Sequence, residues 1–279
     1  MADEAGPAIW VDGEPAAALL ATDRGLHYGD GLFETLAVHD GRIRHLARHL
    51  ARLSHGASCL DLPPPDRDTL RAELTQAAEG YERAVLKLLY TAGSGGRGYC
   101  RPAQPVARRI LLRYPWPAAA SAAAQAEGVR VRLCQTRLAG QPRLAGLKHL
   151  NRLEYVLASR ELAAEGGEPA AEGLLLDGEG TLVEGTRSNL FLVRGGGLLT
   201  PRLERCGVAG IARAVLMECA AALGLPCEER RLDLDDLAQA EEVFVCNSII
   251  GIWPVRAWDD HRYLVGPVTR RLQAAWEGA

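Results

Sequence analysis

Apolar side chains recur at helical spacing in one early segment of the chain. The apolar positions of this segment are Ile43, Leu46, Leu50, Leu53 and Leu60. Arginines at positions 44, 48 and 52 follow one another four residues apart on another face. A period near 3.6 residues is typical of an amphipathic helix, so the pattern predicts a helix with a basic stripe.

Shorter apolar runs bounded by turn residues predict strands on both sides of that helix. The predicted strands span residues 8–11, 31–39, 85–91, 109–114, 129–134, 173–177, 182–184, 189–193 and 242–247. Further helices are predicted at residues 148–162, 210–223 and 267–276. The strands cluster with turn signals and do not alternate regularly with long helices. This arrangement favours an α+β fold over a doubly wound sheet.

An alanine-rich segment of low complexity, residues 116–127, separates two strand-like runs. We therefore predict a small N-terminal α+β domain at residues 1–115 and an interdomain linker at 116–127. A larger C-terminal α+β domain at residues 128–279 is then expected to carry Lys148. An alanine-rich helix is the alternative for the linker segment.

Composition narrows the range of partners. The chain has 279 residues, 48% of them hydrophobic, and a formal charge of -3. This balance gives no reason to expect a nucleic acid or an anionic membrane as partner, and it fits a small-molecule enzyme. The seven cysteines form no C-x-x-C pair, so we expect reduced thiols in a cytoplasmic protein and no zinc site. We expect no signal peptide, because the N-terminus lacks a basic start and an apolar run. We also expect no membrane span, because no apolar stretch approaches the roughly 18 residues needed.

Only two lysines, Lys87 and Lys148, stand among the 32 Lys and Arg residues. Arginine replaces lysine in most cationic roles but cannot form an imine, whereas a desolvated lysine amine can. The segment around Lys148 is therefore a candidate Schiff-base site. The alternative is that Lys148 is a chance survivor on a solvated helix.

Pyridoxal phosphate is the common cofactor that uses a lysine imine, and it also needs a phosphate site and a partner for its pyridine nitrogen. Glu184 is a candidate for that partner, although a surface glutamate is the alternative. Residues 206–213 open a helix with two glycines and could hold the phosphate. Arg52 and Ser248 could contribute to the same phosphate. Equally, Arg52 could lie on a solvated face, and Ser248 could simply end a strand.

Five segments of the chain together resemble a known family. They are His27-Tyr-Gly-Asp-Gly31, Arg52 within His49-Leu-Ala-Arg-Leu53, Lys148 within residues 146–154, Glu184 with Ser188-Asn-Leu-Phe191, and Gly207-Val-Ala-Gly-Ile211. Their order and spacing resemble the fold-type IV pyridoxal-phosphate enzymes over nearly the whole chain. The resemblance implies a two-domain fold like that of D-amino-acid aminotransferases.

Three features are more specific within that family. The run Lys-His-Leu-Asn-Arg-Leu-Glu from Lys148, the loop Gly93-Ser-Gly-Gly-Arg-Gly-Tyr99 and Val245-Cys-Asn247 are similar to 4-amino-4-deoxychorismate lyases. Those enzymes release pyruvate and form p-aminobenzoate for folate synthesis. Branched-chain and D-amino-acid aminotransferases share the cofactor elements and are the first alternative. A non-catalytic binding protein built on the same fold is the second.

The resemblance implies a role for each matching residue. Lys148 would form the Schiff base, Glu184 would contact the pyridine nitrogen, and Thr35 would place a hydroxyl near the reacting atoms. Arg52, the backbone of Gly210 and Ile211, and Ser248 would hold the phosphate. Arg97 and Lys87 would face a substrate with two carboxylates. The family resemblance also implies a homodimer with a small-molecule substrate and no metal.

Overall fold

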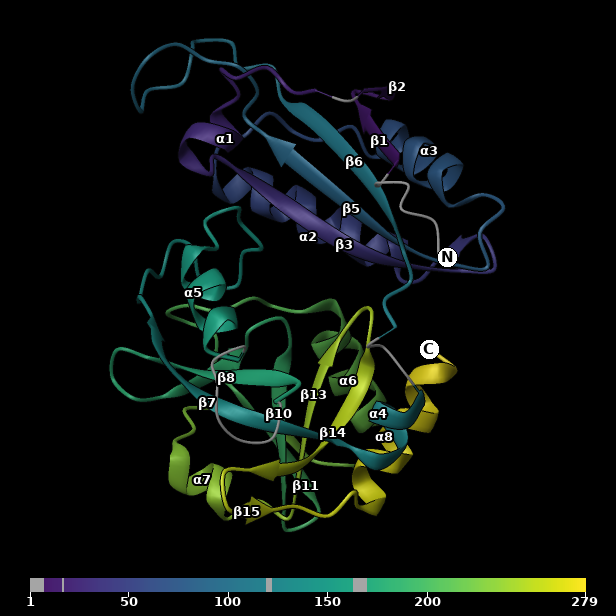
Figure 1. Cartoon of the computed structure of the whole chain (residues 1–279), viewed down its shortest axis with the longest axis vertical. Helices are drawn as coiled ribbons and strands as arrows, with labels where there is room; N and C mark the ends of the chain where they lie inside the picture. Colours follow the sequence, from purple (N-terminus) through teal and green to yellow (C-terminus); the bar gives the residue numbers. More distant parts are fainter. Residues whose placement is uncertain (1–7, 17, 119–121, 163–169) are drawn as a thin grey trace. The chain divides into compact units, whose positions relative to one another are not determined.

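The computed structural model describes residues 8–16, 18–118, 122–162 and 170–279 (Figure 1). The chain divides into two compact units. The first comprises Met1–Pro117 together with Leu147–Asn151, and the second comprises Ala118–Gly146 together with Arg152–Ala279. Residues 1–7, 17, 119–121 and 163–169 lie outside the described part, including three positions of the expected linker.

The first unit contains a six-stranded antiparallel sheet in the order β2-β1-β6-β5-β3-β4. Its strands are β1 (Ala8–Val11), β2 (Glu14–Pro15), β3 (Gly31–His39), β4 (Arg42–Ile43), β5 (Arg83–Thr91) and β6 (Arg108–Pro115). Its helices are α1 (Arg24–Tyr28), α2 (Leu46–Cys59) and α3 (Arg67–Ala78). The strands predicted at 8–11, 31–39, 85–91 and 109–114 are confirmed.

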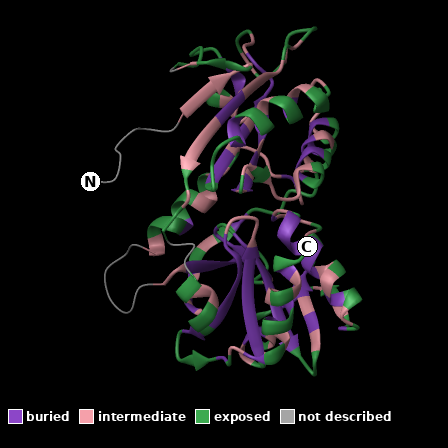
Figure 2. Ribbon diagram, turned by 90° about the vertical axis from the view of Figure 1, so that its right-hand side faces the viewer, coloured by how far each residue is buried: buried purple, intermediate pink, exposed green. Residues whose placement is uncertain are grey.

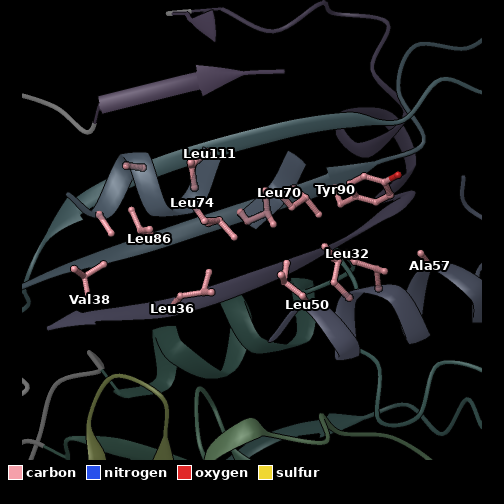
Figure 3. Close-up of a cluster of buried hydrophobic side chains, with 14 of the residues drawn as sticks. Leu32, Leu36, Val38, Leu50, Ala57, Leu70, Leu74, Leu86, Tyr90 and Leu111 are labelled. Atoms are coloured by element: carbon pink, nitrogen blue, oxygen red, sulfur yellow. The ribbon is translucent and has the colours of Figure 1, made fainter. Parts of the chain in front are cut away.

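One face of this sheet packs against α2 and α3 (Figure 3). Alternate residues of β3 point to this face because successive side chains of a strand point to opposite sides. Leu50 and Leu53 of α2 are buried there, which confirms the apolar stripe of the predicted helix. Burial of each leucine stabilises the unit by about 1.5–3 kcal/mol. The opposite face of β3 carries Phe33 and Thr35, both half-buried.

The segment that carries Lys148 differs from its prediction in two ways. We expected a helix over residues 148–162, but α5 spans Leu153–Leu162. We also expected Lys148 in the C-terminal domain, but Leu147–Asn151 groups with the first unit. The reason is backbone pairing with the start of β3. Phe33 N–H donates to the Lys148 carbonyl at 2.9 Å, and Leu150 N–H donates to the Gly31 carbonyl at 3.0 Å.

The second unit contains a nine-stranded mixed sheet in the order β12-β11-β10-β13-β14-β7-β8-β9, with β15 paired to β14. Its strands are β7 (Val129–Leu138), β8 (Glu172–Asp177), β9 (Leu182–Gly185), β10 (Asn189–Arg194), β11 (Gly197–Pro201), β12 (Cys227–Arg230), β13 (Glu242–Asn247), β14 (Gly251–Trp258) and β15 (His261–Arg262). Its helices are α4 (Ala122–Glu127), α5, α6 (Ile211–Ala222), α7 (Leu234–Ala238) and α8 (Pro267–Glu277).

Apolar side chains cover both faces of this second sheet. Its central strands are largely buried (Figure 2). Strands buried on both faces have continuous apolar runs, which is why the sequence predicted them without alternation. Residues of α6 and α8 pack against one face around Phe191 and Phe244, whose stacked rings lie 4.9 Å apart. Helix α4 forms within the segment expected to be a linker, as in the alternative reading of that segment.

Candidate functional site

The residues expected to form a site divide between the two units. The first unit contains Thr35, Arg52, Lys87, Arg97 and Lys148, and the second contains Glu184, Gly210, Ile211 and Ser248.

Both lysines of the chain approach the same aromatic ring. Lys148 Nζ lies 4.2 Å from the centroid of the Phe33 ring, and Lys87 Nζ lies 5.5 Å from it. Thr35 stands directly opposite Lys87 in the antiparallel register of β3 and β5. Because Phe33 and Thr35 share one face of β3, these four side chains gather on that face. The structure therefore brings together three of the residues expected in the site.

The turn before β3 makes the close approach of the Lys148 segment possible. Gly29 ends α1 in the left-handed conformation, with φ 62°, which glycine adopts without strain. A Cβ at Gly31 would lie 2.5 Å from the Tyr90 carbonyl and 2.9 Å from a methyl of Leu150. A larger residue at position 31 would thus collide with the backbone of β5 and with the side chain of Leu150. These two glycines explain the Gly-Asp-Gly pattern in the sequence.

Arg52 is bound to a buried carboxylate on the other face of β3. Arg52 Nε donates to Glu34 Oε1 at 2.8 Å, and Arg52 Nη2 donates to Oε2 at 2.5 Å. His49 Nδ1 lies 2.6 Å from Oε2. Burial alone would raise the pKa of Glu34, but the charge of Arg52 and the bonds from His49 and Arg52 lower it to about 2. Glu34 is therefore an ionised acceptor at neutral pH.

Arg97 lies exposed in the glycine-rich loop after β5, and two other arginines anchor this loop. Arg24, only 3% exposed, donates to the carbonyls of Gly98 at 3.0 Å and Tyr99 at 2.7 Å. Asp30 accepts from Arg24 at 2.9 Å and from Arg101 at 2.5 Å. Burial raises the pKa of Asp30, but the bonds from Arg101 and Arg24 outweigh it and lower the pKa.

Three donors hold Glu184 in the second unit. Tyr155 OH donates to Oε1 at 2.6 Å, while Val208 N–H at 3.0 Å and Asn189 Nδ2 at 3.2 Å donate to Oε2. Glu184 is 3% exposed, so it is not the surface glutamate of the alternative reading. Burial and the Glu184 carboxylate raise the pKa of Tyr155 above its ordinary value. The Tyr155 hydroxyl therefore stays protonated and donates.

Gly210 and Ile211 stand at the start of α6, as the sequence predicted. Gly210 is the N-cap residue and makes no side-chain capping bond. A Cβ there would lie 1.9 Å from Asn189 Oδ1, so only glycine fits against this side chain. Asn189 also donates to Glu184. It therefore contacts both the carboxylate expected at the pyridine nitrogen and the helix start expected at the phosphate. Ser248 follows β13 in a turn where Asn247 Oδ1 accepts from the N–H groups of Ile249 and Ile250.

The donor set fits pyridoxal phosphate. In the first unit, Lys148 is a primary amine of the kind that the aldehyde needs, and Arg52 is a cationic N–H donor of the kind that a phosphate needs. In the second unit, the start of α6 presents backbone N–H groups of the same kind. The pyridine nitrogen needs a carboxylate, and the three donors on Glu184 favour its ionised form.

Among the residues that the structure describes, no group of three or more His, Cys, Asp or Glu residues could hold a metal ion. In the same part of the chain, no helix is both long and apolar enough to cross a membrane.

Several contacting residues were not assigned a role from the sequence. Phe33 and Glu34 directly precede Thr35, and Asp30 lies within the Gly-Asp-Gly motif. None of these three positions indicates by itself which side chain it contacts. Tyr155 lies one residue beyond the Lys148 motif and carried no signal. Most of their partners stand on other elements of the chain, 15 to 71 residues away, so spacing could not reveal them.

Comparison with known proteins places the chain in a family. The model of the family "Amino-transferase class IV" matches residues 31–258. An aminodeoxychorismate lyase from Vibrio harveyi is 34% identical over 269 residues, which cover 95% of this chain and 98% of that protein. A putative branched-chain-amino-acid aminotransferase from Methanocaldococcus jannaschii is 32% identical, covering 93% of this chain and 90% of that protein.

Comparison with solved structures leads to the same family. The crystal structure of 4-amino-4-deoxychorismate lyase from Pseudomonas aeruginosa matches with a TM-score of 0.91 and 51% identity, covering 97% of this chain and 98% of that one. The expected fold-type IV architecture is thereby confirmed, and so is its cofactor, pyridoxal phosphate. The chain belongs to the amino-transferase class IV family of pyridoxal-phosphate enzymes.

Proposed function

We propose that this chain is an aminodeoxychorismate lyase, which releases pyruvate from 4-amino-4-deoxychorismate and leaves p-aminobenzoate for folate synthesis. The observation that carries the proposal is its likeness to the lyase structure from Pseudomonas aeruginosa, at 51% identity over 97% of this chain. The branched-chain aminotransferase from Methanocaldococcus jannaschii is 32% identical.

Lys148 would hold pyridoxal phosphate in the resting enzyme, and the cofactor would supply an electron sink that acidifies the substrate carbon bearing nitrogen. The Lys148 amine would then be the base that removes the proton from that carbon. The carbon–oxygen bond of the enolpyruvyl ether then breaks. Protonated Lys148 returns a proton to the methylene carbon of the departing group, which gives pyruvate. The ring becomes aromatic, so the overall elimination is strongly downhill.

Other side chains have supporting roles in this proposal. Glu184 keeps a proton on the pyridine nitrogen, which increases its capacity to accept electrons. Arg52, the backbone of Gly210 and Ile211, and the Ser248 hydroxyl hold the phosphate. Thr35, opposite Lys87 in the β3–β5 register, assists the proton transfer to the departing group.

Two cations recognise the substrate. Lys87 and Arg97 each bind one carboxylate of aminodeoxychorismate. The position of Lys87, beside the same Phe33 ring as Lys148, supports its assignment.

We also propose that the enzyme acts in the cytoplasm as a homodimer, with neither a nucleic acid nor a membrane as partner. No disulfide joins any of the seven cysteines, which supports a reducing compartment. The formal charge of -3 supports the absence of a polyanionic partner.

The decisive experiment is incubation of the purified holoenzyme with aminodeoxychorismate, with p-aminobenzoate and pyruvate measured together. Equal release of both products is expected. Amino transfer from branched-chain or D-amino acids to a 2-oxo acid, at a higher rate than pyruvate release, would identify an aminotransferase. Bound cofactor with neither activity would identify a non-catalytic binding protein.

A further inference from the structure

The Glu34 carboxylate is a buried charge with no direct role in the proposed chemistry. It is 2% exposed, and it lies on the face of β3 opposite Phe33 and Thr35. Its two oxygens accept from Arg52 Nε at 2.8 Å, from Arg52 Nη2 at 2.5 Å and from His49 Nδ1 at 2.6 Å. An ionised carboxylate only accepts hydrogen bonds, so Nδ1 carries the hydrogen of the last contact.

This geometry fixes the plane of the Arg52 guanidinium. Two parallel hydrogen bonds to one carboxylate fix both the position and the rotation of a guanidinium group. Arg52 and His49 stand three residues apart on α2, so both point from one face of the helix toward the strand. His49 is itself 1% exposed and limits the freedom of Glu34 in turn. The Arg52 side chain, 13% exposed, is thus anchored by a strand as well as by its own helix.

We infer that Glu34, held by His49, is a positioning residue that orients Arg52 toward the phosphate of the cofactor. The inference rests on the phosphate-binding role proposed for Arg52. Glu34 itself touches neither the cofactor nor the substrate. Its contribution is to remove the rotational freedom that a long arginine side chain would otherwise lose on binding the phosphate.

Electrostatics alone leads to the opposite expectation. A negative charge beside Arg52 reduces the attraction between that arginine and a phosphate. If Glu34 acted only through its charge, Glu34→Gln would strengthen phosphate binding. If it acts by orienting Arg52, the same substitution weakens it. The sign of the change therefore separates the two effects.

The test compares two ligands of the apoenzyme that differ only in the phosphate group. The dissociation constants of pyridoxal and pyridoxal phosphate are measured by absorbance titration for the wild type, Glu34→Gln, Glu34→Asp and Arg52→Ala. The dissociation constant of pyridoxal divided by that of pyridoxal phosphate measures how much the phosphate group strengthens binding. A general loss of structure weakens the binding of both ligands alike and leaves this ratio unchanged. Glu34→Asp keeps the carboxylate charge but has a shorter side chain. It replaces Glu34→Gln in the test if Glu34→Gln does not fold.

A matched control is available in the same unit. Glu73 forms an ion pair with Arg109 at 2.9 Å and belongs to no predicted site. Glu73→Gln should leave the ratio of the two dissociation constants unchanged. Glu34→Gln should lower this ratio by about tenfold or more, since a charged hydrogen bond is lost. The double variant with Arg52→Ala should lose no more than Arg52→Ala alone, because both substitutions remove one interaction.

Two results would overturn the inference. If Arg52→Ala lowers the ratio but both Glu34 variants keep or raise it, Arg52 binds the phosphate without help from Glu34. If Arg52→Ala also leaves the ratio unchanged, Arg52 is not a phosphate ligand and the inference falls with that assignment. Neither result bears on the release of pyruvate, which tests the proposed function separately.

Discussion

The amine nitrogen of Lys148 lies 4.2 Å from the centroid of the Phe33 ring. The same pair is also joined through the backbone, since Phe33 N–H donates to the Lys148 carbonyl at 2.9 Å. An aromatic face attracts an ammonium group by about 0.5–2 kcal/mol. The strand residue therefore holds the lysine at two points, which fixes where its amine stands relative to β3.

The first prediction concerns which lysine binds the cofactor. Lys87 also approaches the Phe33 ring, at 5.5 Å, so proximity alone does not distinguish the two amines. Borohydride reduction of the holoenzyme, followed by peptide mapping, should label Lys148. Lys148→Ala should abolish the label, whereas Lys87→Ala should retain it. Label on Lys87 in the wild type would remove the central assignment.

The second prediction concerns the hydroxyl that donates to Glu184 at 2.6 Å. Tyr155→Phe removes this donor and keeps the ring, so the ionised carboxylate is less stabilised. We expect kcat to fall by roughly one order of magnitude while bound cofactor is retained, because one hydrogen bond to a charge is lost. Glu184→Gln should lower kcat further.

Tyr263→Phe is the matched control for this change. The Tyr263 hydroxyl donates to the Leu237 carbonyl at 3.0 Å in the same unit, away from Glu184. Its loss should reduce stability and leave kcat unchanged. Equal kcat values for Tyr155→Phe and the wild type would show that the other partners of Glu184, Val208 and Asn189 among them, suffice to hold it.

Local periodicity predicted α2 because its apolar stripe repeats within one segment and packs on one sheet. The same approach failed for residues 148–152, where the helical pattern of apolar residues competes with backbone bonds to β3. Those bonds join residues more than a hundred positions apart. No local pattern contains such information, so tertiary pairing overrides local preference there.

In the candidate site, too, local sequence indicated some residues, while others became evident only in the folded chain. Lys148 was identifiable because the chain keeps so few lysines, and Glu184 and Arg52 because they stand in family motifs. Their partners Glu34 and Tyr155 were not identifiable, since each acts through a contact that only the folded chain creates. Sequence motifs thus indicated the residues to which we assign the chemistry more readily than the residues that contact them.

The third prediction concerns the loop that carries Arg97. Asp30→Asn neutralises the carboxylate that joins Arg24 and Arg101, which leaves Arg24 buried without its ion pair. The loop should then open more often, and trypsin should cleave after Arg97 about tenfold faster or more. Glu179→Gln, which disrupts an exposed ion-pair group in the second unit, should leave this rate unchanged. Identical cleavage of wild type and Asp30→Asn would mean that the backbone alone maintains the loop.

The fourth prediction is a pH dependence of stability. The pKa of Glu34 is lowered from 4.5 to about 2 in the folded chain. A lowered pKa stabilises the folded state above the unfolded pKa, and this contribution is lost as the pH falls through the folded pKa. At about 1.4 kcal/mol for each pKa unit, the contribution is roughly 3 kcal/mol.

Urea unfolding of the apoenzyme tests this dependence. The stability difference between the wild type and Glu34→Gln should be constant between pH 6 and pH 8. It should shrink as the pH falls from about 4.5 toward 2, since the protonated carboxyl then resembles the amide. A difference that does not change with pH over this range would contradict an ionised Glu34.

The last prediction separates the lyase from an aminotransferase through the number of carboxylates on the substrate. Aminodeoxychorismate has two carboxylates, whereas a branched-chain amino acid has one. Each charged contact is worth about 1.5–3 kcal/mol, so Lys87→Ala and Arg97→Ala should each lower kcat/KM for the lyase reaction by roughly one to two orders of magnitude. The absorbance of the bound cofactor should not change, because neither residue is assigned to it.

Arg160→Ala, at an exposed position of α5, controls for the loss of a cation and should leave kcat/KM unchanged. If both variants release pyruvate at the wild-type rate, these cations do not recognise the substrate. Should the wild type also transfer amino groups to a 2-oxo acid faster than it releases pyruvate, the aminotransferase takes the place of the lyase.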